Sequence, residues 1–189
     1  MKPPPFKYTR PESLAEVIAI LAEHGYDAKV LAGGQSLVPL LNMRFARPEV
    51  LVDITRVGEL RGISTSDETW IGATTSQATV LADEAVRSRT PMLVEAMRWV
   101  AHPAIRNRGT LGGTVAHADP AAEAPAVVVA LDGELTIQGP RGERAVDAED
   151  FFQGSFTTAL DPDEVLTGVR FPFASPARRF AFMEVARRH

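Results

Sequence analysis

The clearest hydrophobic pattern in the chain lies close to its beginning. Apolar residues recur at helical spacing from Leu14 to Leu21, which is the pattern of an amphipathic helix. Ser13 and Glu16 form a Ser-x-x-Glu capping box at the start of this pattern, and Gly25 is a typical residue just past a helix end. We therefore predict a helix between Ser13 and Gly25.

Several apolar runs are too short to be helices and are typical of strands. These runs are residues 28–32, 50–54, 62–64, 69–73 and 164–171. A Gly-Gly-Gln-Ser segment separates the first run from another apolar stretch at residues 37–41. After Thr55 the runs become shorter and alternate with turn-forming residues, so we place a subdomain boundary near Arg56.

Further helices are predicted at about residues 76–82, 92–100 and within 121–131. The last of these is restricted by Pro125, and the second ends before the His102-Pro103 pair. Residues 134–146 are predicted to form a hairpin around a Gly-Pro-Arg-Gly turn. Strands outnumber convincing helices and do not alternate with them regularly, which favours an α+β fold over a doubly wound sheet.

Composition narrows the function classes. The chain has 189 residues, 45% of them hydrophobic, a net charge of -4 and no cysteine. This charge gives no reason to expect nucleic acid or an anionic membrane as partner, and no apolar stretch is long enough to span a bilayer, so a cytoplasmic protein is expected. Without cysteine these residues hold no disulfide and no cysteine-ligated iron–sulfur cluster. The histidines are too widely spaced for a local metal motif, so redox chemistry would need an organic cofactor.

Two pairs of adjacent glycines are candidate phosphate-binding turns. They lie in residues 32–36 (Ala-Gly-Gly-Gln-Ser) and 110–114 (Thr-Leu-Gly-Gly-Thr). Glycine leaves backbone N–H groups open to a pyrophosphate, although a single Gly-Gly pair is explained equally well as an ordinary turn. Neither segment is a Rossmann fingerprint or a P-loop. If both bind phosphate, valine at Gly33 or Gly112 should abolish cofactor binding and leave the fold largely intact.

These segments, taken in order, resemble the FAD-binding subunit of the xanthine dehydrogenase family, and most closely the medium subunit of aerobic carbon monoxide dehydrogenases. The resemblance rests on residues 32–36, on residues 101–113 (Ala-His-Pro-Ala-Ile-Arg-Asn-Arg-Gly-Thr-Leu-Gly-Gly) and on residues 117–123 (His-Ala-Asp-Pro-Ala-Ala-Glu). Residues 6–11 and the Asp53-Ile54 strand end match as well. The similarity covers essentially the whole chain.

The resemblance implies an α+β fold of the molybdopterin dehydrogenase (PCMH-like) type, with FAD held extended and noncovalently between two subdomains. Residues 1–56 would form the N-terminal FAD-binding subdomain and residues 57–176 the second one. Residues 177–189 would begin a linker to a C-terminal domain that family members carry and this chain lacks, which makes it look like a fragment, a split subunit or a truncated product.

The resemblance also implies a set of cofactor-binding residues. Lys29 to Ser36 and Thr110 to Thr114 would contact the pyrophosphate and its surroundings, and Glu123 would occupy the acidic position at the adenosine ribose. Ala101, Ala118 and Leu166 would line the groove. The full set is Lys29, Val30, Leu31, Ala32, Gly33, Gly34, Gln35, Ser36, Ala101, Thr110, Leu111, Gly112, Gly113, Thr114, Ala118, Glu123 and Leu166. We expect no metal ligand and name no catalytic residue.

One departure from the family pattern concerns a cation. Family members often carry a lysine after the last strand of this domain, where this chain has Phe182-Met183-Glu184-Val185. No cationic contact is therefore carried over to this segment.

In this family a molybdopterin-binding large subunit oxidises the substrate, a small 2Fe-2S subunit carries the electrons, and FAD passes them to an external acceptor. The resemblance thus predicts an electron-transfer flavoprotein subunit with those two partners. Two alternatives remain open at this point. The chain could be a scaffold that holds no flavin, or a flavoprotein of the distantly similar type that tethers FAD through a histidine.

Other conspicuous residues have ordinary structural explanations beside functional ones. We expect Trp70 and Trp99 to lie in the core, Asp119 to begin a turn before Pro120, and His102 to be a helix cap or core group. His117 is the better candidate for a flavin neighbour. Two arginines could neutralise phosphates, and we expect at least one of them to be solvated. They are Arg106 and Arg108.

Overall fold

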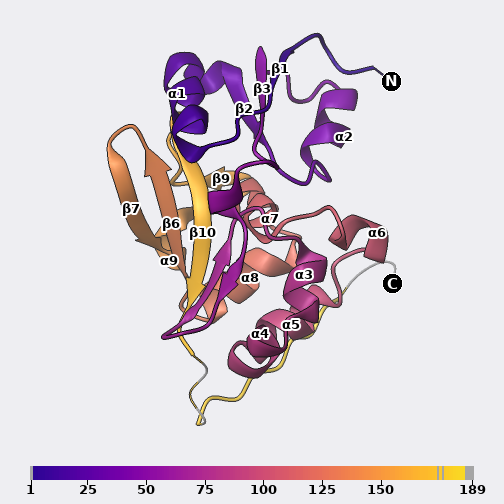
Figure 1. The fold of residues 1–189 in the computed structure, drawn as a ribbon. Coiled ribbons are helices and arrows are strands. Elements are labelled where there is room, and N and C mark those ends of the chain that lie inside the picture. Colours follow the sequence, from indigo (N-terminus) through magenta and orange to yellow (C-terminus); the bar gives the residue numbers. More distant parts are fainter. Residues whose placement is uncertain (1, 174, 176, 186–189) are drawn as a thin grey trace.

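The computed structural model describes residues 2–173, 175 and 177–185, which form an α+β fold with two main sheets (Figure 1). The α+β expectation is confirmed. The end of the predicted linker, residues 186–189, lies outside the described residues, as do residues 174 and 176 of the predicted second subdomain. The strands are β1 (Lys7–Thr9), β2 (Ala28–Leu31), β3 (Val50–Asp53), β4 (Ile63–Ser64), β5 (Thr69–Gly72), β6 (Glu134–Gly139), β7 (Gly142–Asp147), β8 (Phe152–Gly154), β9 (Thr157–Thr158) and β10 (Val165–Phe171).

The helices are short, and most of them follow β5 in the chain. They are α1 (Leu14–His24), α2 (Leu37–Asn42), α3 (Gln77–Ala82), α4 (Glu84–Arg89), α5 (Pro91–Met97), α6 (Pro103–Arg106), α7 (Leu111–His117), α8 (Glu123–Ala130) and α9 (Ala148–Phe151). The sequence pattern indicates α1, α3, α5 and α8. It does not indicate α4, which follows the N-cap residue Asp83, or α6, where Pro103 occupies the first turn.

The N-terminal part is a parallel three-stranded sheet of order β1-β3-β2 with α1 packed against it. The Ser13 hydroxyl accepts a hydrogen bond from the Glu16 N–H, so the predicted cap is present. The Glu16 carboxylate accepts from the N–H of Glu12 at 2.9 Å. Val17 and Leu21 on α1 are buried against the strands, which explains why this helix is readable from its spacing.

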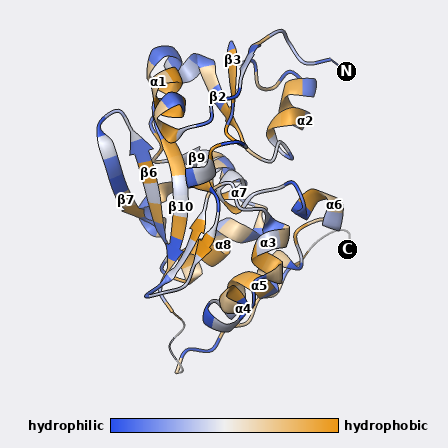
Figure 2. Cartoon of the chain, in the orientation of Figure 1, coloured by the Kyte–Doolittle hydropathy of each residue, from blue (hydrophilic) through white to orange (hydrophobic). Residues whose placement is uncertain are grey.

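The second part is an antiparallel five-stranded sheet of order β4-β5-β10-β6-β7. Its central strand β10 is almost wholly buried, and the edge strand β7 is mostly exposed and hydrophilic (Figure 2). Helices α5, α7 and α8 pack together beside this sheet and share its hydrophobic core. Val165, at the start of β10, packs with the core of the N-terminal part, so this strand connects the two parts.

Two expectations about local structure are wrong. Trp99 follows α5 and is 44% exposed, whereas a core position was expected. Residues 111–114 are not a turn but the beginning of α7, with Thr110 as its N-cap residue. A turn is predicted there because glycine is a weak helix former. In the structure, tight packing around Gly112 outweighs that low helix propensity.

Candidate cofactor site

A cleft of about 610 Å³ lies between the N-terminal part and the second part. One wall comes from β2, the loop that follows it and the beginning of α2. The other comes from α7, residues 156–158 in and before β9 with the residues after them, and the start of β10. Its volume is within the range of sites that hold small molecules and cofactors.

The loop after β2 carries backbone N–H groups that donate to none of the described residues. The successive N–H groups of Gly33 to Ser36 donate no hydrogen bond to any residue that the structure describes. The Gln35 side chain donates to the Gly33 carbonyl at 3.0 Å, and Gly34 has a φ of 73° that glycine adopts readily. A row of unpaired N–H groups on a cleft wall is suited to an anion such as a phosphate.

Gly33 is also a packing residue. A Cβ atom placed on it would lie 2.2 Å from the carbonyl oxygen of Arg108 and 2.9 Å from the Cα of Gly109. The backbone of this loop therefore touches the backbone before α7 directly. Gly112, at the start of α7, is likewise a packing residue, because a Cβ atom placed on it would lie 2.5 Å from the Cβ of Ala73. Valine at either position cannot leave the fold intact, so that expectation is wrong.

The second glycine segment has its backbone donors already in use. The Leu111 N–H donates to the Thr75 carbonyl, that of Gly112 to the Ala73 carbonyl and that of Gly113 to the Thr110 hydroxyl. These bonds fix the first turn of α7 to the strand end behind it. The polar group that this segment offers to the cleft is the half-buried Thr114 hydroxyl.

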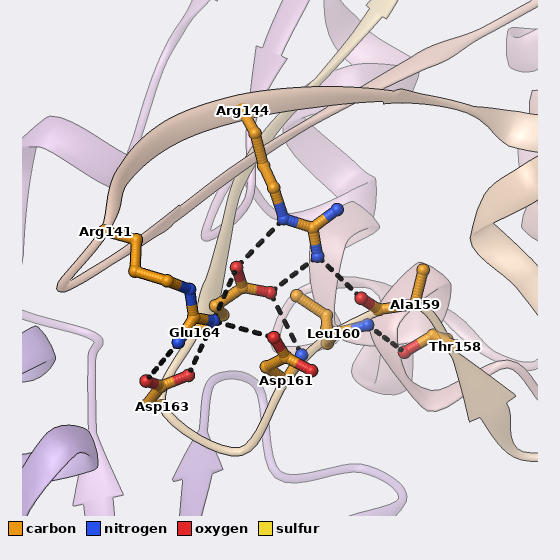
Figure 3. A network of polar contacts seen from close by, with 8 residues as sticks. All are labelled: Arg141, Arg144, Thr158, Ala159, Leu160, Asp161, Asp163 and Glu164. Atoms are coloured by element: carbon orange, nitrogen blue, oxygen red, sulfur yellow. Dashed lines mark hydrogen bonds and ion pairs between the residues drawn. The ribbon is translucent and has the colours of Figure 1, made fainter.

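An ionic network lies where β10 begins (Figure 3). The buried Glu164 carboxylate accepts from Arg144 at 2.6 and 2.9 Å and from the Asp161 N–H at 3.0 Å. Arg141 pairs with Asp161 and Asp163. The hydrogen bonds from Arg144 lower the pKa of Glu164, although burial acts in the opposite direction. Glu164 and Asp161 both line the cleft, so the network holds part of its wall in place.

Residues 4–174 match the protein family described as the FAD binding domain in molybdopterin dehydrogenase. The chain belongs to this family. FAD is thus the cofactor of the family, and its two phosphates agree with the unpaired N–H row at the edge of the cleft.

Known proteins resemble this FAD-binding domain along its whole length. It is 46% identical to the 6-hydroxypseudooxynicotine dehydrogenase complex subunit alpha of Paenarthrobacter nicotinovorans, over 100% of this chain and 64% of that protein. It is also 46% identical to the caffeine dehydrogenase subunit beta of a Pseudomonas species, over 100% and 65%. The solved carbon monoxide dehydrogenase of Hydrogenophaga pseudoflava matches with a TM-score of 0.96 and 41% identity, over 100% and 66%. The domain therefore spans slightly less than two thirds of these relatives.

Most of the residues predicted to bind the cofactor line the cleft. These are Lys29, Val30, Ala32, Gly33, Gly34, Gln35, Ser36, Thr110, Gly112, Gly113, Thr114 and Leu166. Five others do not line it, namely Leu31, Ala101, Leu111, Ala118 and Glu123. Leu111, the first residue of α7, is fully buried, Ala118 caps that helix with a φ of 49°, and Ala101 lies in the exposed loop after α5. Their contact with FAD remains a prediction.

Glu123 begins α8 and is half-buried. Withdrawal from water raises the pKa of its carboxyl, and the nearby carboxylates of Glu184 and Asp119 raise it further, while a backbone hydrogen bond at Glu123 itself lowers it. Asp119 accepts from the N–H of Ala121 at 2.9 Å. The expected turn at Asp119 is therefore present.

Of three residues singled out in the sequence, Arg106 has clear local contacts. Arg106 donates to the carbonyls of Val100 and Ala101 at 2.7 and 3.2 Å, so it fastens the loop before α6. Arg108 is exposed and lines a second, smaller cleft. His102 occupies the N-cap position of α6 without a side-chain cap bond.

Aromatic residues on the cleft were missed from the sequence. Phe156 lines it, is 59% exposed and packs against His117 with ring centroids 5.2 Å apart. Tyr26 lies at the same cleft and is 80% exposed. Neither residue stands in a motif, and only the folded arrangement reveals that their rings border the cleft.

Two further results concern the described residues only. None of their helices is both long and apolar enough to cross a membrane. They contain no group of three or more histidine, aspartate or glutamate side chains placed to hold a metal ion.

Proposed function

We propose that this chain holds FAD noncovalently in the cleft between residues 1–56 and residues 57–176. The observation that carries the proposal is the row of unpaired N–H groups from Gly33 to Ser36 on the cleft wall. These groups would bind the pyrophosphate, and the Thr114 hydroxyl would add a donor from the opposite wall. The second glycine segment would orient α7 rather than cradle phosphates.

We further propose that the chain is the flavin subunit of a molybdenum hydroxylase. Bound FAD supplies a redox-active ring that accepts electrons and passes them on. The electrons would come from iron–sulfur clusters on a small 2Fe-2S partner, which receives them from a molybdopterin-binding large partner, and would go to an external acceptor. Relatives named as subunits or medium chains of dehydrogenases support this proposal.

Purification from the native host tests the proposed complex. The protein should elute with two partner chains, one larger and one smaller than itself. The complex should contain molybdenum and iron by metal analysis and FAD by absorbance. Elution without molybdenum and iron would contradict the assignment to a molybdenum hydroxylase, even if FAD were bound.

A cation is available at the cleft for the charge of the pyrophosphate. Lys29 lines the cleft, its side chain is exposed, and it pairs with no described residue. Lys29→Met should weaken FAD binding by roughly 3- to 10-fold at low salt, and by less at high salt, because exposed charges are screened. Fluorescence titration measures this. Lys7→Met, on the exposed face of β1 and away from the cleft, should bind FAD as the wild type does.

Glu123 gives a prediction in which stability and binding move in opposite directions. A carboxyl whose pKa is raised in the folded state stabilises the fold below its unfolded pKa of about 4.3 and loses that contribution as pH rises through the folded pKa. Glu123→Gln stays neutral, so the FAD-free chain should melt at a higher temperature at pH 7 and equally at about pH 4.

If Glu123 binds the ribose, the same substitution should weaken FAD binding, since an amide accepts weaker hydrogen bonds than a carboxylate. Glu95→Gln on the exposed face of α5 serves as the control and should change neither quantity. Weaker binding without a gain in stability at pH 7 would show that Glu123 is not the desolvated carboxylate inferred from the structure.

A further inference from the structure

Gln77, the first residue of α3, is a buried polar residue directly behind the cofactor cleft. It is 2% exposed, and its side-chain amide donates to the Thr114 hydroxyl at 2.9 Å. Its backbone N–H donates to the Gly109 carbonyl, also at 2.9 Å. Gly109 leaves the room that this amide occupies, because a Cβ there would lie 2.9 Å from Gln77 Oε1.

The Gln77 side chain lowers the stability of the fold. Gln77 Oε1 is buried and accepts no hydrogen bond from any described residue. A buried polar atom without a partner costs free energy, and an apolar side chain of similar size would avoid that loss. Stability alone therefore does not explain a glutamine at this position. Its one side-chain hydrogen bond, to Thr114, is the interaction that an apolar residue could not make.

That hydrogen bond determines how the Thr114 hydroxyl can be used. A hydroxyl has one proton to donate and two lone pairs to accept with. The Gln77 amide N–H occupies one lone pair, and the proton points to the Thr110 carbonyl at a long 3.2 Å. Because Gln77 is a donor toward Thr114, it does not compete for this proton, which can turn to a better acceptor in the cleft.

We propose that Gln77 is a positioning residue for cofactor binding. It holds the Thr114 hydroxyl so that its proton is available to a phosphate oxygen of FAD. The inference rests on the proposed function, because Thr114 is placed there at the pyrophosphate. It adds that a residue on α3, outside the cleft and outside both glycine segments, sets the affinity for the cofactor through Thr114.

A double-mutant cycle tests the proposal. FAD dissociation constants are measured by fluorescence titration for the wild type, Gln77→Leu, Thr114→Val and the double variant, together with the melting temperature of each FAD-free chain. Gln77→Leu should weaken FAD binding roughly 3- to 10-fold, the loss expected for one neutral hydrogen bond. In the Thr114→Val background it should have no further effect. The FAD-free Gln77→Leu chain should melt no lower than the wild type, because the unpartnered Oε1 is gone.

Gln153→Leu, which changes an exposed glutamine on β8, is the matched control and should leave affinity unchanged. Gln77→Met, with a flexible apolar side chain of similar length, takes the place of Gln77→Leu if the latter does not fold. Wild-type affinity in the Gln77 variant, or an equal loss with and without the Thr114 hydroxyl, would overturn the positioning role while leaving FAD binding intact. A wild-type chain that binds no FAD would overturn the proposed function and this inference together.

Discussion

Gly33→Ala should remove FAD binding and lower the stability of the chain by about 2–3 kcal/mol, the upper part of the usual range for overpacking a tight interior site. The added methyl would lie 2.2 Å from the Arg108 carbonyl oxygen. Both sides of this contact are backbone, so relief requires the loop after β2 to move away from α7. That movement displaces the unpaired N–H groups and opens the cleft at the position proposed for the pyrophosphate.

Thermal melting and FAD titration measure the two effects. In a chain of this size the melting temperature should fall by roughly 4–12 °C. Gly58→Ala is the matched control, because a Cβ there meets nothing within 4 Å, and it should change neither stability nor affinity. A Gly33→Ala chain that melts and binds FAD like the wild type would show that the loop is free of the contact described here.

Arg144→Met should be the most damaging change in the ionic network, with an expected loss of about 2–4 kcal/mol at neutral pH. Removing one partner from a buried pair leaves the other charge uncompensated, although the partial exposure of Arg144, 39%, reduces the effect. Arg87→Met breaks a pair with Glu84 in which both side chains are exposed. It should lower the stability by about 0–1 kcal/mol, the usual contribution of a surface ion pair.

The loss at Arg144 should depend on pH in a defined direction. A carboxyl with a lowered folded pKa stabilises the fold above its unfolded pKa, about 4.3, and loses this contribution as pH falls through the folded value. Because Arg144 is the main cause of the lowered pKa of Glu164, urea unfolding of Arg144→Met and the wild type should converge in acid. A difference that stays constant from pH 7 to below pH 4 would contradict the ionic explanation.

The sequence predicts the elements whose pattern reflects their own burial. Helix α1 is readable from Val17 and Leu21, which face one core, and β10 from a continuous apolar run that is buried along its length. Trp99 shows the limit of this reasoning. It stands in an apolar stretch but lies beyond the end of α5, between the exposed Arg98 and the buried Val100, and a periodic pattern does not show where a helix ends.

The candidate site also has features that the sequence indicates and features that only the fold reveals. Adjacent glycines indicate backbone that can come close to another group, and the group predicted at both segments is a phosphate, which stays a prediction. The sequence does not show what approaches. Gly33 meets the Arg108 backbone and Gly112 meets Ala73, and both contacts join segments far apart in the chain. Nothing in the sequence indicates the importance of Gln77, because a glutamine at the start of a helix is usually a surface residue. Only the fold shows that this one is buried.

The most direct test of the account is FAD uptake by the purified chain itself. The chain is stripped of flavin, titrated with FAD and then precipitated with acid. We expect saturable binding of one FAD per chain and release of the flavin into the supernatant, because the proposed site holds the cofactor through N–H groups and not through a covalent bond. A chain that takes up no FAD, or flavin that stays in the acid pellet, would contradict it.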